Sequence, residues 1–327
     1  MRRLRTGRVL GGVLAFGVLA VGCSSDGGAG SPSPATPSRA QVVAIVASVD
    51  LYASAPQRVS VGLVTNDNKL VSYGTVDFAF SYVGTADQPQ QPEAGPTATA
   101  TFVPVFGTTG SGDAPRITLP SQGRGIYEAS DVTFDRAGFW QVSVSADVRD
   151  VGTQRALATF EVGAQASLPA SGDPALATAN LTLASIRGDV PAAAVDSRAA
   201  TEGAIPDPEL HGLTIARALR EGRPALVVFS TPVYCQSQFC GPVTDMVQDL
   251  AKRYTDRAAF IHVEIWKDFE NQVLNQAALD WLQMPSGDLT EPWLFLIGAD
   301  GTIVDRWSSM WSEDEVAAAL EALPARG

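Results

Sequence analysis

Apolar and polar residues alternate in short runs through residues 40–165. QVSVSADV (141–148) alternates at every position, which is the pattern of a strand with one buried face. Seven such β-rich runs are separated by clusters of Asn, Asp, Gly and Pro, and the turn sequences NDN (66–68) and DRAG (135–138) predict hairpins. This spacing of short strands predicts an all-β, immunoglobulin-like sandwich over 40–165. It contains no grouping of acids, His or Cys that would carry chemistry, so we interpret it as an interaction module or spacer.

The pattern changes twice further along the chain. Residues 166–210 are rich in Pro, Ala, Ser and Asp and lack sustained periodicity, which predicts a linker. Residues 211–327 then alternate between helical and strand-like periods. The predicted helices are 214–222, 242–254, 270–282 and 312–323, and the predicted strands are 224–231, 258–266, 292–298 and 302–309. Ser312 and Glu315 have the spacing of a capping box at the start of the last helix.

The first residues resemble an export signal. Four arginines precede an apolar run of thirteen residues, Val9 to Val21, which is short for a permanent membrane helix. Ala20-Val21-Gly22-Cys23 then resembles a bacterial lipobox, which implies a signal peptide over 1–22 and lipidation of Cys23. An ordinary signal peptide with an incidental cysteine is the alternative. Residues 23–39 read as a flexible Ser-, Gly- and Pro-rich tether. The expected location is extracytoplasmic, anchored to the cell membrane.

Charge narrows the range of partners. The formal net charge is −12, and no cluster of basic residues occurs outside the signal. Nucleic acid is therefore not expected as a partner, and membrane contact would come from the lipid anchor. Nothing in the sequence implies a cofactor, and the oligomeric state stays open.

Two of the three cysteines, Cys235 and Cys240, lie between the first strand and the second helix of residues 211–327. The order strand–helix–strand–helix, then strand–strand–helix (βαβα-ββα), resembles the thioredoxin superfamily, especially its extracytoplasmic TlpA-like members. Pro292 begins EPWLFLIG at the place of the family's cis-proline, and ADGTIVDRW is similar to the hairpin that follows. The resemblance implies a thioredoxin fold and a redox dithiol. Its partners would be thiols and disulfides of envelope proteins and a membrane electron donor.

The family's pattern is Cys-x-x-Cys, whereas this chain has Cys-x-x-x-x-Cys. Family order implies that Cys235 attacks and Cys240 resolves, but Cys240 is closer to the helix N-terminus, which lowers a thiol's pKa. The family's buried aspartate would fall near Val228 or Phe229, both apolar. Glu291 is the candidate replacement as proton acceptor, with an exposed loop carboxylate as the alternative.

Three other interpretations remain. STPVYCQSQFCG is similar to the Ser-Thr-Pro-x-Cys pattern of some peroxiredoxins, but Thr231 precedes Cys235 by four residues rather than three, and Glu291-Pro292 replaces their later arginine. Metal binding, as in copper-delivering relatives, would need a histidine, and only His211 and His262 exist. Their spacing from the cysteines does not fit a zinc site. The third interpretation is a redox-inert binding or scaffold protein with a structural disulfide.

Overall fold

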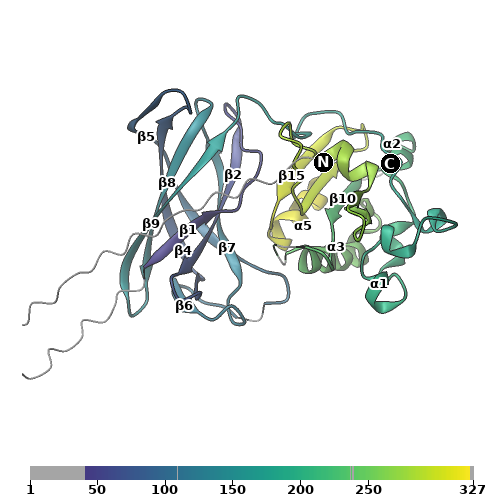
Figure 1. The fold of residues 1–327 in the computed structure, drawn as a ribbon, viewed down its shortest axis with the longest axis horizontal. Coiled ribbons are helices and arrows are strands. Elements are labelled where there is room, and N and C mark those ends of the chain that lie inside the picture. Colours follow the sequence, from purple (N-terminus) through teal and green to yellow (C-terminus); the bar gives the residue numbers. More distant parts are fainter. Residues whose placement is uncertain (1–40, 109, 236, 238, 325–327) are drawn as a thin grey trace, which may run out of the picture. The chain divides into compact units, whose positions relative to one another are not determined.

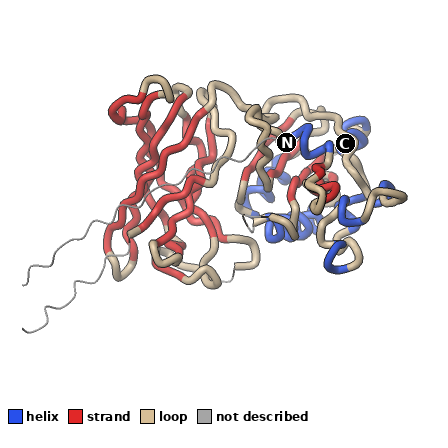
Figure 2. The backbone as a smooth tube through the Cα atoms, in the orientation of Figure 1, coloured by secondary structure: helices blue, strands red, loops and turns tan. Residues whose placement is uncertain are grey.

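The computed structural model describes residues 41–108, 110–235, 237 and 239–324 (Figure 1). The signal peptide, Cys23 and the whole tether predicted from the sequence lie outside these residues. Within the described ranges, no helix combines the length and the apolar character needed to cross a membrane. The chain is rich in strands, which form several sheets (Figure 2).

Nine strands between residues 41 and 162 form one antiparallel sheet. Its path runs β6-β3-β2-β7-β5-β4-β8-β9, and β1 pairs with β2. The strands are β1 (Val42–Val46), β2 (Pro56–Thr65), β3 (Leu70–Ser72), β4 (Thr75–Gly84), β5 (Pro89–Pro104), β6 (Arg116–Thr118), β7 (Gly125–Thr133), β8 (Gly138–Val148) and β9 (Gly152–Val162).

Alternation along these strands builds a single core. In β8, Val142 and Val144 are buried while their neighbours are partly exposed, and Phe78 and Phe80 of β4 do the same from the adjacent strand. Because β1 also packs beside β9, at the far end of the path, the sheet curls around one cluster of buried side chains. The arrangement is compatible with a β-sandwich.

The two turn predictions have different outcomes. NDN (66–68) joins the paired strands β2 and β3, so that hairpin is confirmed. DRAG (135–138) joins β7 to β8, but these strands are not hydrogen-bonded neighbours, because β5 and β4 lie between them. The hairpin prediction there is wrong: the local turn signal says nothing about which strands pair.

The segment expected as a linker is ordered and partly buried. It contains three short 3-10 helices, Leu183–Ser185, Ala192–Ala194 and Pro208–His211, and one helical turn, α1 (Ala199–Glu202). Ala194, Val195 and Leu210 are fully or almost fully buried. Leu210 belongs to the same apolar cluster as residues of the following sheet, so this segment packs as part of that region.

The C-terminal region has a four-stranded sheet in the order β11-β10-β14-β15. β10 and β11 are parallel, and the other pairs are antiparallel. The elements are α2 (Ile215–Arg220), β10 (Ala225–Ser230), α3 (Cys240–Tyr254), β11 (Ala259–Glu264), α4 (Gln276–Leu282), β14 (Trp293–Ile297), β15 (Ile303–Ser308) and α5 (Glu313–Ala322). A separate two-stranded sheet consists of β12 (Trp266–Asp268) and β13 (Val273–Leu274).

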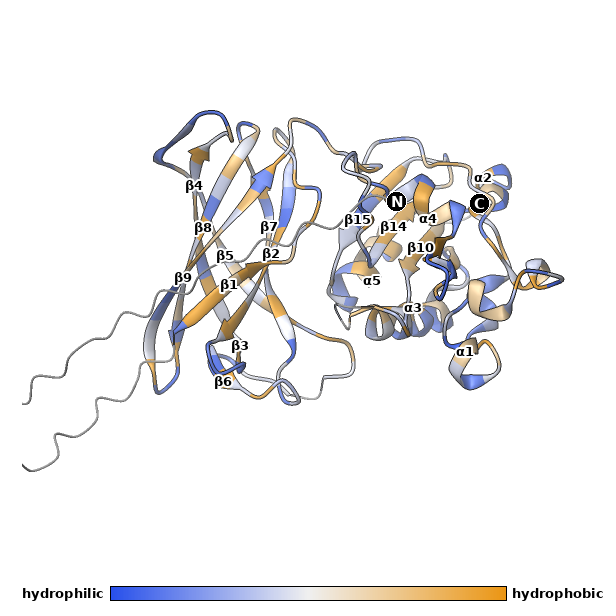
Figure 3. Ribbon diagram, viewed as in Figure 1, coloured by the Kyte–Doolittle hydropathy of each residue, from blue (hydrophilic) through white to orange (hydrophobic). Residues whose placement is uncertain are grey.

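Helices cover both faces of this sheet. β10 is apolar over most of its length and wholly buried, and Figure 3 shows it largely orange. Val227 and Phe229 pack with α2 and α4, whereas Leu226 and Val228 pack with α3 and α5. This two-sided burial explains why the strand is a continuous apolar run rather than an alternating one.

Two helix starts and one helix cap differ from the sequence-based expectation. α3 begins at Cys240, two residues earlier than predicted. α4 begins only at Gln276, because β13 pairs with β12 and the Asn275 amide donates to the carbonyls of Ala194 and Glu264. Ser312 is at the N-cap of α5 without a side-chain cap bond. The predicted capping box does not form, because the Glu315 carboxylate pairs with Arg58 instead.

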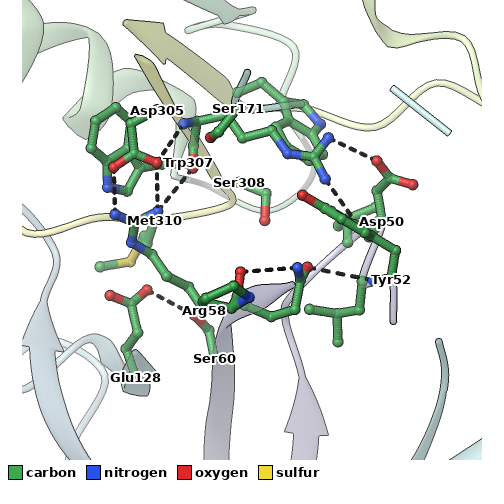
Figure 4. Close-up of a pocket in the computed structure, with 16 residues that line it drawn as sticks. Asp50, Tyr52, Arg58, Ser60, Glu128, Ser171, Asp305, Trp307, Ser308 and Met310 are labelled. Carbon is green, nitrogen blue, oxygen red and sulfur yellow. Dashed lines mark hydrogen bonds and ion pairs between the residues drawn. The ribbon is translucent and has the colours of Figure 1, made fainter. Parts of the chain in front are cut away.

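Arg58 of β2 connects the nine-stranded sheet with the C-terminal region. Its guanidinium donates to both oxygens of Asp305 at 2.9 and 2.7 Å and to Glu315 at 2.6 Å, and it lies over the Trp307 ring. Figure 4 shows the bonds between Arg58 and Asp305 at the edge of a cavity of about 80 Å³. No cysteine lines it. Its arginines pair with aspartates (Arg58 with Asp305, Arg306 with Asp50), and Glu128 accepts from the Ser60 hydroxyl. We therefore interpret the cavity as part of the packing between these elements.

Candidate functional site

Cys235 and Cys240 form a disulfide between β10 and α3. Their Cα atoms are 6.0 Å apart, because the loop turns back before the helix begins. β10 ends at Ser230 beside its parallel neighbour β11, so the disulfide lies beyond the carboxyl ends of these two parallel strands. Loops at this edge of an open α/β sheet are a common place for functional groups.

The two sulfurs differ in access to solvent. The Cys240 side chain is fully buried in the first turn of α3, whereas Cys235 is partly exposed and its Sγ lies 3.1 Å from the Ser237 hydroxyl. The unpaired N–H groups at the start of this 15-residue helix favour a thiolate in its first turn. One cysteine is therefore reachable by another protein, and the other lies in the helix field.

Glu291 lies beside the disulfide. One of its carboxylate oxygens is within 4.8 Å of both sulfurs, and it is half-buried rather than an exposed loop carboxylate. The Glu291–Pro292 peptide bond is cis, and Pro292 is buried immediately before β14. Burial raises the pKa of Glu291, and the nearby Glu264 carboxylate raises it further.

Glu264, the last residue of β11, is a second carboxylate near this site. It is almost fully buried and accepts hydrogen bonds from the backbone N–H groups of Ser197, Ile265 and Trp266. Burial raises its pKa. Nothing in the sequence marks Glu264 as a site residue, because the apolar run around it predicts only a strand.

Aromatic side chains lie next to Cys235. The Tyr234 and Phe269 rings stack in parallel with centroids 3.9 Å apart, and Trp266 meets Phe269 edge-on. Phe269 and Val233 are more than a third exposed. An accessible sulfur flanked by exposed apolar surface is suited to contact with another protein chain.

Phe239, which precedes Cys240, contacts the nine-stranded sheet. It packs against an apolar cluster of Val103, Val105, Ile126 and Met310, of which the first three come from the β5–β7 region. The end of the cysteine loop is therefore supported by the β-strand region as well as by its own helix.

The structure thus brings together Cys235, Cys240, Glu291 and Pro292. It places His211 and His262 in a different group, fully buried with Asp196 and Asp207. Cys23 lies outside the described residues.

Comparisons with known proteins give no family. No protein-family model matches the sequence, and no curated protein matches it significantly. One solved structure that matches is the crystal structure of BslA, a bacterial hydrophobin, with 14% identity over 38% of this chain and 93% of that chain and a TM-score of 0.20. A likeness at that level carries no argument about this chain.

Proposed function

We propose that this chain is an extracytoplasmic thiol–disulfide oxidoreductase with a thioredoxin-like fold over residues 211–327. The observation that carries the proposal is the disulfide itself: partly exposed Cys235 is bonded to buried Cys240 in the first turn of α3. The order of β10, α3, β11, α4, β14, β15 and α5 and the cis Glu291–Pro292 bond beside the sulfurs support it. The region before residue 165, an immunoglobulin-like sandwich in this proposal, serves as an interaction module or spacer.

The proposed reaction moves two electrons from the dithiol to a partner disulfide. The Cys235 thiolate attacks one sulfur of the partner's disulfide, so a mixed disulfide forms and a partner thiolate leaves. Cys240 then loses its proton and attacks the Cys235 sulfur, which re-forms the Cys235–Cys240 bond and releases the second partner thiolate. Protons return to the partner's thiolates, and a membrane electron donor reduces the chain again.

Two carboxyl groups, half-buried Glu291 and almost fully buried Glu264, are available for the proton of Cys240. Glu291 is the nearer to the sulfurs, and its pKa is raised by burial and then by the charge of Glu264. A raised pKa makes a carboxylate a better proton acceptor. A negative charge beside the sulfurs also disfavours the thiolate, which favours a reducing rather than an oxidising potential.

Glu291→Gln should therefore move the redox potential of the pair toward oxidising values. If about one unit of thiol pKa is at stake, the shift is about 30 mV, and equilibration against glutathione and dithiothreitol series measures it. Glu161→Gln, which removes an exposed carboxylate on β9, is the matched control and should leave the potential unchanged. A wild-type potential near −120 mV, roughly that of strong periplasmic oxidants, or no shift in Glu291→Gln, would contradict this direction.

The same titration separates the other function classes. A bond that stays oxidised below about −300 mV would indicate a structural disulfide in a binding or scaffold protein. Turnover of hydrogen peroxide would favour the peroxiredoxin-like alternative. That alternative needs the Thr231 hydroxyl to bind peroxide, and the Thr231 side chain is fully buried.

Membrane attachment through Cys23 is a further part of the proposal. A Cys23→Ser variant should lose its acyl group and move from the membrane to the soluble fraction. A diacylglyceryl group supplies two chains, which is sufficient for stable anchoring. Mass spectrometry of the wild-type N-terminus tests this directly, and an unmodified Cys23 there would contradict it.

A further inference from the structure

Both histidines of the chain meet in one buried group with two aspartates. The rings of His211 and His262 have centroids 5.0 Å apart, and the side chains of Asp196 and Asp207 lie against them. All four residues have no solvent exposure. They come from separate parts of the fold, because His262 is in β11 while the other three belong to the segment before α2.

The hydrogen bonds of His262 determine which of its ring nitrogens carries the hydrogen and which one faces Asp196. Its Nε2 lies 3.1 Å from the Ser230 carbonyl, which can only accept, so this nitrogen carries the hydrogen. In the neutral ring, Nδ1 then presents a lone pair, and it lies 3.4 Å from Asp196 Oδ2. Among the described residues Nδ1 has no hydrogen-bond partner. Two acceptor atoms face each other there, and only a proton or a metal cation between them resolves the conflict.

The spacing of the four candidate atoms fits a metal ion. His211 Nε2 lies 3.3 Å from Asp196 Oδ2 and 3.2 Å from Asp207 Oδ1, and all four atoms are within 4.8 Å of one another. Bonds of about 2.0–2.1 Å in a tetrahedral zinc site separate neighbouring ligands by about 3.3–3.4 Å. Charge-assisted hydrogen bonds are shorter, at about 2.7–2.9 Å.

The groups around these atoms resemble an outer shell. Ser230 holds His262 through its carbonyl, as is usual for a metal-bound imidazole. Arg198 donates to Asp196 at 2.6 Å and to Asp207 at 2.5 Å, which orients both carboxylates. When no metal is bound, the positive charges of Arg198 and of one protonated histidine balance the two carboxylates. A metal ion and a proton therefore compete for this site.

We propose that Asp196, Asp207, His211 and His262 form a closed site for a divalent transition metal, best fitted by Zn²⁺. Two imidazoles and two carboxylates are ligands that zinc accepts, whereas Mg²⁺ and Ca²⁺ prefer oxygen alone. With four protein ligands and no exposure, the metal is structural. It fastens the segment between Asp196 and His211 to β11.

Hydrogen bonds also connect this site to α3, the helix that carries Cys240. The Ser230 hydroxyl bonds to His262 at 3.0 Å and to the Thr244 hydroxyl at 2.7 Å, and Thr244 donates to the Cys240 carbonyl at 2.7 Å. This chain of bonds links the metal ligands to the first turn of α3. The proposal does not depend on redox activity, because it uses neither cysteine.

The test measures metal in the full-length, detergent-solubilised protein purified without chelators. Elemental analysis should give about one Zn²⁺ per chain, and Co²⁺ added after chelation should give the intense visible bands of a tetrahedral site. His262→Gln and Asp207→Asn should each lower bound metal at least roughly tenfold, and chelation should lower the thermal midpoint of the wild type. Asp245→Asn, which removes an exposed carboxylate near Arg198, is the matched control and should keep the metal.

The Cys235→Ser/Cys240→Ser double variant separates this site from the thiols. It should keep its Zn²⁺, and loss of metal there, with retention in His262→Gln, would overturn the proposal. Absence of metal from the wild type, with no Co²⁺ bands and no change in thermal midpoint on adding Zn²⁺, would also overturn it and leave a proton-balanced charge network. These wild-type measurements test metal binding even where a variant fails to fold.

Discussion

A Cys240→Ser variant is expected to accumulate mixed disulfides with envelope proteins, and a Cys235→Ser variant is expected to accumulate roughly tenfold fewer. Cys235 is partly exposed and can contact a partner's disulfide, whereas Cys240 has no exposed surface. Without Cys240 nothing resolves the mixed disulfide, so it persists. Non-reducing gels of cells expressing each variant, followed by mass spectrometry of the shifted bands, measure the difference.

Access and thiolate character point to different cysteines. Cys240 lies at the N-terminus of α3, which favours its thiolate, but a thiolate that no partner can reach does not attack. The Cys235→Ser/Cys240→Ser variant gives the background of trapped species. More trapping by Cys235→Ser than by Cys240→Ser would reassign the nucleophile to Cys240, and would mean that the loop before α3 opens when the bond is reduced.

The periodicity of the sequence predicts most elements of residues 211–324, because each helix there buries one apolar face and each central strand buries two. α2 forms where a helix is predicted, with Thr214 at its N-cap, and it ends at Arg220, two residues before the left-handed Gly222. The early part of the predicted helix 270–282 is wrong, since Val273 and Leu274 form a strand paired with β12. That pairing depends on a partner strand that local periodicity does not register.

The residues of the candidate sites also fall into those that the sequence predicts and those that it does not. The places of Cys235, Cys240 and Pro292 follow from element order, and Glu291 follows from its neighbour in sequence. Element order does not reveal Glu264 or Asp196, because a buried carboxylate is recognisable only through its tertiary partners. The residues around Asp196 and Asp207 are rich in Pro and Ala, which predicts a loop and gives no indication that acids from it meet His262.

Replacing Arg58 by Met should destabilise the folded protein by about 2 kcal/mol, below the usual cost of breaking a fully buried ion pair because Arg58 keeps some exposure. The substitution leaves Asp305 and Glu315 without their shared cation and removes the contact with the Trp307 ring. Denaturant unfolding followed by tryptophan fluorescence measures the loss. Arg149→Met breaks an exposed pair with Asp113 and is the control, with an expected change of about 0–1 kcal/mol.

The loss in Arg58→Met should grow with pH because a third carboxyl, Glu128, lies close by. Burial, and then the charge of Glu315, raise the pKa of Glu128 from 4.5 to about 7. The folded state therefore binds this proton more tightly than the unfolded chain, so wild-type stability falls as pH rises from about 4.5 to about 7 and levels off above that. Without Arg58 the ionised Glu128 faces two unpaired carboxylates, which steepens the fall. Glu128→Gln should flatten this pH dependence of stability both in the wild type and in Arg58→Met. If Arg58→Met costs the same stability at both ends of this pH range, carboxylate repulsion is not what Arg58 relieves.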